Sequence, residues 1–220
     1  MAKAAASCQR ERGARDTSTR RLLVGALIVL AACSEKGSAP VAFDTTATAP
    51  DSFRVKLETT RGPVVVEVHR SWAPLGTQRF YQLVGRGLLD DNGFYRVVPK
   101  FIVQFGAVPD PKVNAHWDSL KFADDPRVEK NLRGTMAFAQ EGKNSRTHQL
   151  FVNLSDNPHL DKAGFVPIGK VVSGMESMDS VYAGYGEKPE YHLIASLGNN
   201  YLRRMFPRLD YIRTARLARP

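Results

Sequence analysis

The segment Phe94–Gly106, FYRVVPKFIVQFG, constrains the fold of this chain more than any other stretch. Most of its residues are apolar or aromatic, as in a buried strand, and Pro99 divides the run because proline cannot donate a ladder hydrogen bond. Arg96 and Gln104 lie inside the run, although an apolar core accepts such groups only where partners satisfy them. The segment therefore predicts two strands that carry two polar side chains for a specific reason.

Short strand patterns continue on both sides of this segment. Apolar residues alternate in 53–57 and 64–68 around a turn at 60–62, which predicts a β-hairpin. Further strands are predicted at 133–140, 148–154, 165–174 and 209–217. Short, closely spaced strands with few helices favour a closed antiparallel barrel with helices at its ends.

Two or three helices are predicted beside these strands. Apolar residues near helical spacing, followed by a glycine stop at Gly85, predict a helix over 74–85. Further helices are predicted at 175–184 and 191–206. The segment 107–131 is polar and contains proline, so we expect an irregular surface excursion there.

Residues 1–33 are predicted to be a signal peptide. An uncharged apolar run extends from Leu22 to Cys33 and is too short to span a membrane as a helix. Its last four residues, LAAC, resemble the lipobox of bacterial lipoproteins, in which the cysteine is lipidated and the preceding residues are removed. A buried core helix is the alternative, and the arginine pair at 20–21 leaves twin-arginine export open.

Residues 34–52 are small and polar and predict a flexible linker. Residues 53–220 are predicted to form one domain with a C-terminal helix and a final strand. A lipidated Cys33 would tether this domain to a membrane, stably if it carries two or more acyl chains. We therefore expect an exported, membrane-anchored lipoprotein that faces the periplasm or the extracellular side.

Charge and cysteine content narrow the possible functions. The chain has 31 Lys+Arg and 22 Asp+Glu, but residues 1–32 hold six and two of these, so the remainder has a net charge of about +5 and predicts no nucleic-acid partner. Cys8 and Cys33 are the only cysteines, so a chain that begins at an acylated Cys33 has no thiol nucleophile or disulfide. The five histidines lack ligand spacing, and phosphate-loop and G-x-S-x-G motifs are absent, so no metal or cofactor is expected.

Basic residues gather near the C-terminal end of the sequence: Arg203, Arg204, Arg208, Arg213, Arg216 and Arg219. A solvated helix face with a basic tail explains such a cluster. Attraction to anionic lipid headgroups, or docking of a partner, is the alternative.

The segment Phe94–Gly106 closely resembles the cyclophilin signature, and so do two later blocks. The fixed signature positions are all met, by Phe94, Arg96, Pro99, Phe101, Gln104 and Gly106. The later blocks are GTMAFAQEGKNSRTHQLFVNL and HLDKAGFVPIGKVVSGMESMDSV, and the C-terminal stretch resembles a bacterial subgroup of the family. The resemblance covers about Phe53 to Gly184 and implies a mainly β fold, a closed antiparallel eight-stranded barrel capped by two or three helices.

The resemblance implies peptidyl-prolyl cis-trans isomerase activity on proline-containing peptides and unfolded protein segments, and we expect a monomer. Rotation about an X–Pro amide has a barrier of about 18–20 kcal/mol and breaks no covalent bond, so it needs no nucleophile, metal or cofactor. In the twisted amide the prolyl nitrogen has a usable lone pair. A permanently charged donor near that nitrogen therefore stabilises the transition state selectively.

The resemblance also implies which residues form the site. Arg96, Phe101 and Gln104 are the expected catalytic residues: Arg96 donates to the twisted amide, Phe101 grips the proline ring, and Gln104 binds the peptide carbonyl or orients Arg96. The expected substrate-binding residues are Ile102, Ala139, Gln140, Gln149, Phe151, His159, Leu160 and Phe165.

Several positions depart from the best-known family pattern. His159 stands where many relatives have Trp, and Phe165 stands where they have His. His148 replaces the usual Ser before Gln149, and Leu150 replaces the usual Phe after it. The first two bear on binding of the drug cyclosporin more than on catalysis. They also support an alternative function, a cyclophilin-like chaperone module that binds proline-containing segments with little turnover.

Overall fold

The computed structural model describes residues 47–218. The predicted signal peptide with Cys33 and most of the predicted linker lie outside the described residues. Within residues 47–218, none of the helices has the length and apolar content that crossing a membrane requires.

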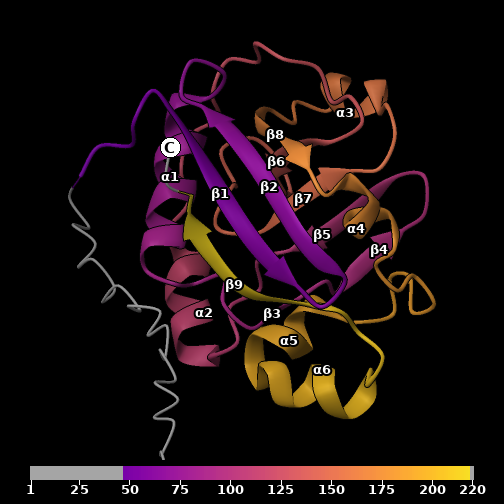
Figure 1. Cartoon of the computed structure of the whole chain (residues 1–220). Helices are drawn as coiled ribbons and strands as arrows, with labels where there is room; N and C mark the ends of the chain where they lie inside the picture. Colours follow the sequence, from indigo (N-terminus) through magenta and orange to yellow (C-terminus); the bar gives the residue numbers. More distant parts are fainter. Residues whose placement is uncertain (1–46, 219–220) are drawn as a thin grey trace, which may run out of the picture. The chain divides into compact units, whose positions relative to one another are not determined.

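In the described part of the chain, nine antiparallel strands form one curled sheet around the core (Figure 1). Their order is β3-β9-β1-β2-β8-β6-β7-β5-β4, so the last strand lies between two early ones. The strands are β1 (Ser52–Thr59), β2 (Gly62–His69), β3 (Asn92–Gly93), β4 (Arg96–Val98), β5 (Ile102–Phe105), β6 (Thr135–Phe138), β7 (Leu150–Asn153), β8 (Pro167–Ser173) and β9 (Tyr211–Leu217).

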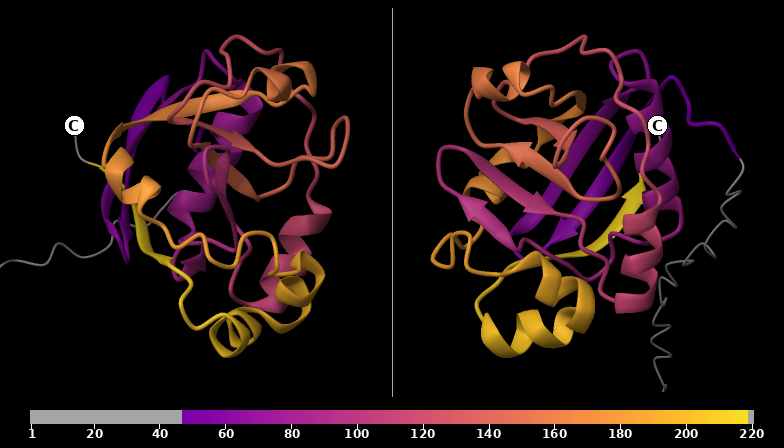
Figure 2. Two further views of the ribbon diagram at one scale, coloured as in Figure 1. Left: turned by 90° about the vertical axis from the view of Figure 1, so that its right-hand side faces the viewer. Right: turned by 180° about the vertical axis from the view of Figure 1, so that it is seen from behind.

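Six helices accompany the sheet within the same residues. Figure 2 shows α1 and α2 stacked along one side of the sheet, while α5 and α6 pack together near β3 and β9. The helices are α1 (Pro74–Gly85), α2 (Pro111–Ser119), α3 (Pro158–Lys162), α4 (Met175–Asp179), α5 (Tyr191–Leu197) and α6 (Asn199–Met205).

The predicted mainly β, antiparallel fold is confirmed, but the numbers of elements differ. Residues 47–218 contain nine strands rather than eight, in an order that runs from β3 at one end to β4 at the other, and six helices rather than two or three. The hairpin predicted around residues 60–62 is confirmed, with Phe53 opposite Val68 and Thr59 opposite Gly62.

Two secondary-structure predictions, an irregular segment over 107–131 and one helix over 191–206, are corrected by local capping and sterics. The segment 107–131 contains α2, which begins at Pro111 after Asp110, whose Oδ1 accepts hydrogen bonds from the N–H groups of Lys112 and Val113 at 2.8 and 3.2 Å. The single helix predicted over 191–206 is divided at Gly198. There φ is +61° and an added Cβ would lie 2.1 Å from a backbone carbonyl oxygen, so only glycine fits.

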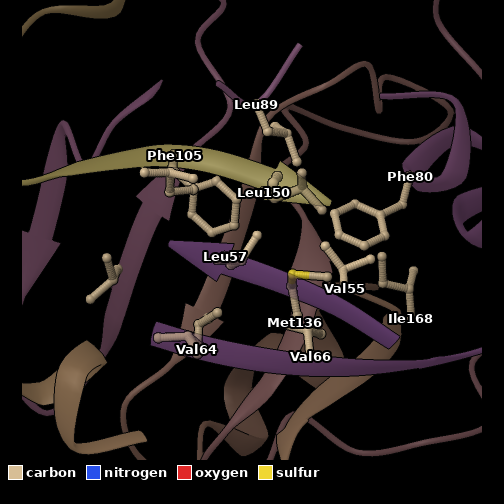
Figure 3. Close-up of a cluster of buried hydrophobic side chains, with 14 of the residues drawn as sticks. Val55, Leu57, Val64, Val66, Phe80, Leu89, Phe105, Met136, Leu150 and Ile168 are labelled. Atoms are coloured by element: carbon tan, nitrogen blue, oxygen red, sulfur yellow. The ribbon is translucent and has the colours of Figure 1, made fainter. Parts of the chain in front are cut away.

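The main core lies between the curled sheet and α1 (Figure 3). Phe80, Leu83 and Val84 of α1 are three and four residues apart, so they share the buried face of the helix. Burial of each large apolar side chain contributes about 1.5–3 kcal/mol. The strands supply many of the other fully buried side chains, including Val55, Leu57, Val64, Val66, Met136 and Leu150.

Strands β4 and β5 bury one face in the core and turn the other toward a pocket. Val97 and Val103 lie opposite each other and join the core, whereas Arg96 and Gln104, also paired, are only partly buried. Because side chains alternate along a strand, the polar residues must leave the core on the opposite face. This explains why Arg96 and Gln104 lie within the apolar segment Phe94–Gly106.

Three of the C-terminal arginines contact other side chains within the domain. Arg203 forms an ion pair with Asp91 at 2.5 Å, and the guanidinium of Arg208 lies 4.1 Å from the ring centroid of Tyr182. Arg216 pairs with Asp90 at 2.6 Å. These contacts favour a solvated domain surface over a free basic patch for lipid.

Candidate active site

A row of paired side chains crosses four neighbouring strands beneath a pocket. Arg96 of β4 pairs with Gln104 of β5. Gln104 pairs with Phe151 of β7, which pairs in turn with Ala137 of β6. Directly paired residues of antiparallel strands point to the same face, so the row runs from a charged end to an apolar end. Arg96, Gln104 and Phe151 line a cavity of about 590 Å³.

The apolar end of the pocket is built from aromatic and aliphatic side chains. Phe151 and Phe165 meet edge to face with ring centroids 5.5 Å apart. Leu160 comes from the short helix α3, and the Phe165 N–H donates to its carbonyl at 3.0 Å. With Phe101 and Ile102 these residues form a small cluster separate from the main core. Such a surface suits an apolar ring of proline size.

Phe101 is held at the turn between β4 and β5. Its N–H donates to the Val98 carbonyl at 3.0 Å, and its carbonyl accepts from Leu154 N–H at 2.8 Å and Asn157 Nδ2 at 3.0 Å. Lys100, before it, has φ of +59° and directs the chain through the turn. The Phe101 backbone is thus fixed on both sides while its ring stays half-buried at the pocket.

Arg96 places a guanidinium at the polar end of the pocket. Its Nη1 donates to Gln104 Oε1 at 3.3 Å, and its Nε donates to Glu187 Oε1 at 2.7 Å. Its Cζ lies 5.7 Å from the ring centroid of Phe101, within the range of a cation–π contact. Charge and apolar surface therefore meet within one cavity.

Tyr95, Gln104 and Gln149 form a hydrogen-bonded triangle at the pocket. Gln104 Nε2 donates to the Tyr95 hydroxyl oxygen at 2.9 Å and to Gln149 Oε1 at 3.3 Å. The Tyr95 hydroxyl donates to Gln149 Oε1 at 2.6 Å. Burial raises the pKa of Tyr95, so the hydroxyl keeps the proton that it donates. Gln104 is engaged at both ends of its amide, which favours the prediction that it orients Arg96.

A second polar network lies farther along the same pocket. Tyr191 donates to Asp118 Oδ2 at 2.7 Å, and Asn114 Nδ2 donates to the same atom at 3.1 Å. Burial raises the pKa of Asp118 despite these hydrogen bonds. His148 Nε2 lies 3.3 Å from Asp118 Oδ1, yet burial lowers the pKa of His148 to about 4. We take the imidazole as neutral at pH 7, because its desolvation outweighs the nearby carboxylate.

The structure brings most residues expected from the sequence to this pocket. His159 does not line the cavity; its ring lies 5.3 Å from that of Phe101 and packs against it from outside. Ala139 lines the pocket, but its N–H donates to the Gln149 carbonyl at 2.9 Å and is already used. Cys33 lies outside the described residues. The predicted residues that line the cavity are Arg96, Phe101, Ile102, Gln104, Ala139, Gln140, Gln149, Phe151, Leu160 and Phe165.

Sequence reasoning missed several residues of the site. Tyr95 lies inside the signature segment at a position that the signature leaves open, and Glu187 contacts Arg96 from 91 residues away. Neither has a local signal that would identify it as part of the site. Other lining residues that were not predicted are Asp118, Lys121, Glu141, Ser145, Thr147 and Tyr191.

Comparison with known proteins agrees with this geometry. Residues 54–197 match the model of the family described as cyclophilin type peptidyl-prolyl cis-trans isomerase. Peptidyl-prolyl cis-trans isomerase A of Dickeya dadantii is 35% identical over 146 residues, which cover 64% of this chain and 76% of that protein. A peptidyl-prolyl cis-trans isomerase of Acinetobacter baylyi is 30% identical over 133 residues, 58% of this chain and 70% of that protein.

Solved structures give the same fold. The crystal structure of a Cryptosporidium parvum cyclophilin-type isomerase matches with a TM-score of 0.59 and 21% identity, over 77% of this chain and 99% of that one. A second structure of that protein, in the presence of the dipeptide Ala-Pro, matches with a TM-score of 0.58 and 20% identity, over 76% of this chain and 99% of that one. The family match spans more than half of the sequence, and the curled antiparallel sheet agrees with it. The chain belongs to the cyclophilin family, and its activity is peptidyl-prolyl cis-trans isomerisation.

Proposed function

We propose that this protein isomerises X–Pro bonds of exported proteins, with Arg96 as the donor to the twisted amide, and that it works from a lipid anchor at Cys33. The observation that carries the catalytic part is the position of the Arg96 guanidinium beside an apolar cavity. One end of this cavity suits the ring of a proline, and the other presents a permanent charge.

The catalytic step follows from where charge develops. Twisting the amide removes resonance and leaves a lone pair on the prolyl nitrogen, which a planar amide does not offer. A guanidinium that donates to that nitrogen interacts more strongly with the twisted form than with either planar form, and so lowers the barrier. Phe101, Phe151 and Leu160 hold the proline ring while the rest of the peptide rotates.

Gln104 keeps Arg96 directed toward the cavity. Its Oε1 accepts from Arg96, and its Nε2 is fixed by Tyr95 and Gln149. A side chain held at both ends presents its acceptor in one orientation, which limits the orientations of the guanidinium. We therefore assign Gln104 to orienting Arg96 rather than to binding a peptide carbonyl directly.

Export and tethering are supported by the sequence alone. The apolar run from Leu22 to Cys33 and its LAAC ending support removal of residues 1–32 and acylation of Cys33. The linker, residues 34–52, would then separate the anchor from a domain that comprises residues 53–220. Mass spectrometry of the protein from its native membrane tests this: a mature N-terminus at Cys33 with added acyl mass is expected, and an unmodified chain that keeps residues 1–32 would contradict it.

The variant Arg96→Ala tests the catalytic assignment. We expect exchange of a proline peptide, measured by NMR, to slow by about 10²-fold, the effect of removing one transition-state donor. The control is Arg54→Ala, because Arg54 forms an ion pair with Glu67 on the β1–β2 hairpin and does not line the pocket. Wild-type exchange rates in a folded Arg96→Ala variant would overturn the role of Arg96.

A further inference from the structure

The loop between α4 and α5 lies beside β4, the strand that carries Arg96. Figure 2 shows this loop next to the edge of the sheet, and the Val97 N–H donates to the Gly186 carbonyl at 3.1 Å. Gly186 has φ of +58°, a conformation that glycine adopts without strain. The next residue, Glu187, contacts Arg96 from the loop side. The loop is therefore hydrogen-bonded to the edge strand β4 and places the carboxylate of Glu187 next to Arg96.

The loop is anchored by its own contacts. Tyr185 packs edge to face against both Tyr182 and Phe206, with ring centroids 5.1 Å apart in each case. Within the loop, Gly186 N–H donates to the Ala183 carbonyl and Lys188 N–H to the Tyr185 carbonyl, both at 3.0 Å. Aromatic packing and tight turns fix the backbone on both sides of Glu187. The Glu187 side chain is consequently attached to a backbone with a defined position.

Three contacts restrict the Arg96 guanidinium. Nε donates to Glu187 Oε1 at 2.7 Å, and Nη2 lies 2.5 Å from the same oxygen. On the other side Nη1 donates to Gln104, and Phe101 lies beneath the Cζ. Arginine has five N–H groups, so Glu187 and Gln104 leave others on Nη1 and Nη2 for a ligand in the cavity. Glu187 thus grips the guanidinium without using all of its donors.

We propose that Glu187 is a positioning residue for prolyl isomerisation, which orients the Arg96 guanidinium before the peptide binds. This inference rests on the proposed role of Arg96. A free arginine side chain loses rotamer entropy when it is fixed, and a preformed contact meets this cost before the transition state. Glu187 does not touch the substrate; it acts through Arg96.

The Glu187 carboxylate has two opposite effects on Arg96. It orients the guanidinium, and its negative charge weakens the electric field of the guanidinium. The Glu187 side chain is 62% exposed and that of Arg96 is 30% exposed. Water screens a charge at such a site, so the Coulomb interaction with a group inside the cavity is reduced. Orientation is not screened in this way. We therefore expect the orienting effect to outweigh the loss of field, and the kcat of the Glu187→Ala variant decides between them.

The test compares Glu187→Ala and Glu187→Gln in the full chain, by NMR exchange of a proline peptide at several peptide concentrations. Glu187→Ala should lower kcat about fivefold and leave KM within about twofold, because the orienting contact matters in the transition state. Glu187→Gln keeps an acceptor and should retain most of the activity. Glu190→Ala is the matched control, because Glu190 is an exposed carboxylate of the same loop that pairs with His192 at 3.6 Å.

A second readout separates orientation from a general effect on the loop. The ¹⁵N order parameter of Arg96 Nε should fall in Glu187→Ala and remain near the wild-type value in Glu190→Ala. In an Arg96→Ala background, Glu187→Ala should cause no further loss, because the two residues act as one unit.

Three results would overturn the proposal. A rise in kcat in Glu187→Ala would show that the carboxylate competes with the substrate for Arg96. Unchanged kcat, or a further loss in the Arg96→Ala background, would show that Glu187 does not act through Arg96. If Arg96→Ala keeps full activity, the proposed role of Arg96 is wrong. If Arg96→Ala loses activity and Glu187→Ala does not, only the proposed role of Glu187 is wrong.

Discussion

Arg146 and Arg96 carry the same guanidinium group into two regions with opposite surroundings. The Arg146 side chain is 1% exposed, with its Nη2 3.1 Å from Asp125 Oδ2 and its Nε 3.3 Å from Asp124 Oδ1. We call these three residues the buried ion-pair cluster. The Arg96 side chain is 30% exposed and lines an open cavity. A buried guanidinium whose charge is matched supports the fold, whereas one beside a cavity keeps donors for a ligand.

The buried ion-pair cluster supports helix α1. Asp125 Oδ1 accepts from the Leu75 N–H at 2.8 Å and Oδ2 from the Gly76 N–H at 2.9 Å. These are first-turn N–H groups, and Ala73, the N-cap residue, makes no side-chain cap hydrogen bond. Asp125 therefore serves as a distant cap, with its charge close to the positive end of the helix dipole. Arg146 balances this carboxylate and also donates to the carbonyl of Ala123.

One short segment joins the two regions. Arg146 belongs to the buried ion-pair cluster, and Gln149, three residues later, lines the pocket. Between them His148 is fully buried beside Asp118. Substitutions along this segment can therefore separate stability from catalysis.

The largest expected effect comes from Arg146→Ala, measured by urea unfolding. Removal of one partner leaves Asp125 buried and uncompensated, so the free energy of unfolding should fall by about 3–5 kcal/mol. The control Lys56→Ala removes an exposed ion pair with Glu58 and should change it by less than about 1 kcal/mol. The distinction between the regions would break if Arg146→Ala kept full stability, or if its folded fraction lost isomerase activity.

The next effect is a pH dependence that originates at His148. Burial disfavours the imidazolium and lowers the pKa of His148 in the folded state from the usual 6.5 to about 4. Below pH 6.5 the unfolded chain therefore binds a proton at His148 that the folded chain does not bind. The free energy of unfolding consequently falls as the pH drops. The loss should approach about 3 kcal/mol near pH 4. Urea unfolding of His148→Gln from pH 7 to 4 should give a flatter curve than the wild type, and parallel curves would contradict this assignment.

The smallest effect sharpens the comparison through a matched pair of substitutions. Arg96→Lys keeps the charge but loses the planar fork, so kcat should fall about tenfold while stability changes by less than about 0.5 kcal/mol. Arg146→Lys should instead lower the free energy of unfolding by about 1–2 kcal/mol and leave kcat unchanged. NMR exchange and urea unfolding of both variants provide the measurements. A loss of stability at residue 96 or of activity at residue 146 would reverse the comparison.

Features that depend on residues close in sequence could be predicted. The helix α1 was predicted with its observed bounds, 74–85, because apolar spacing, proline and glycine all lie within it. The strands β4 and β5, on either side of Pro99, were also predicted from the local apolar pattern. The helix α2 was missed because its composition is polar, although Asp110 and Pro111 form a recognisable helix start.

Features that depend on distant partners could not be predicted. Tyr191 and Asp118 are 73 residues apart, and neither has a neighbour in sequence that indicates the other. Asp125 caps α1 from 49 residues beyond Gly76, so its capping role has no local pattern. The resemblance to a family identified the pocket and Gln104, but Glu187, which also contacts Arg96, comes from a loop whose path is set by tertiary packing.

The position of β9 between β3 and β1 has a consequence for when the protein can fold. Ile212 and Ala215 of this strand are fully buried in the main core, although they are among the last described residues to be synthesised. The edges of β1 and β3 that face β9 have no strand partner until it emerges. The domain therefore completes its sheet only after β9 has been synthesised, and β1 and β3 each expose an unpaired strand edge until then.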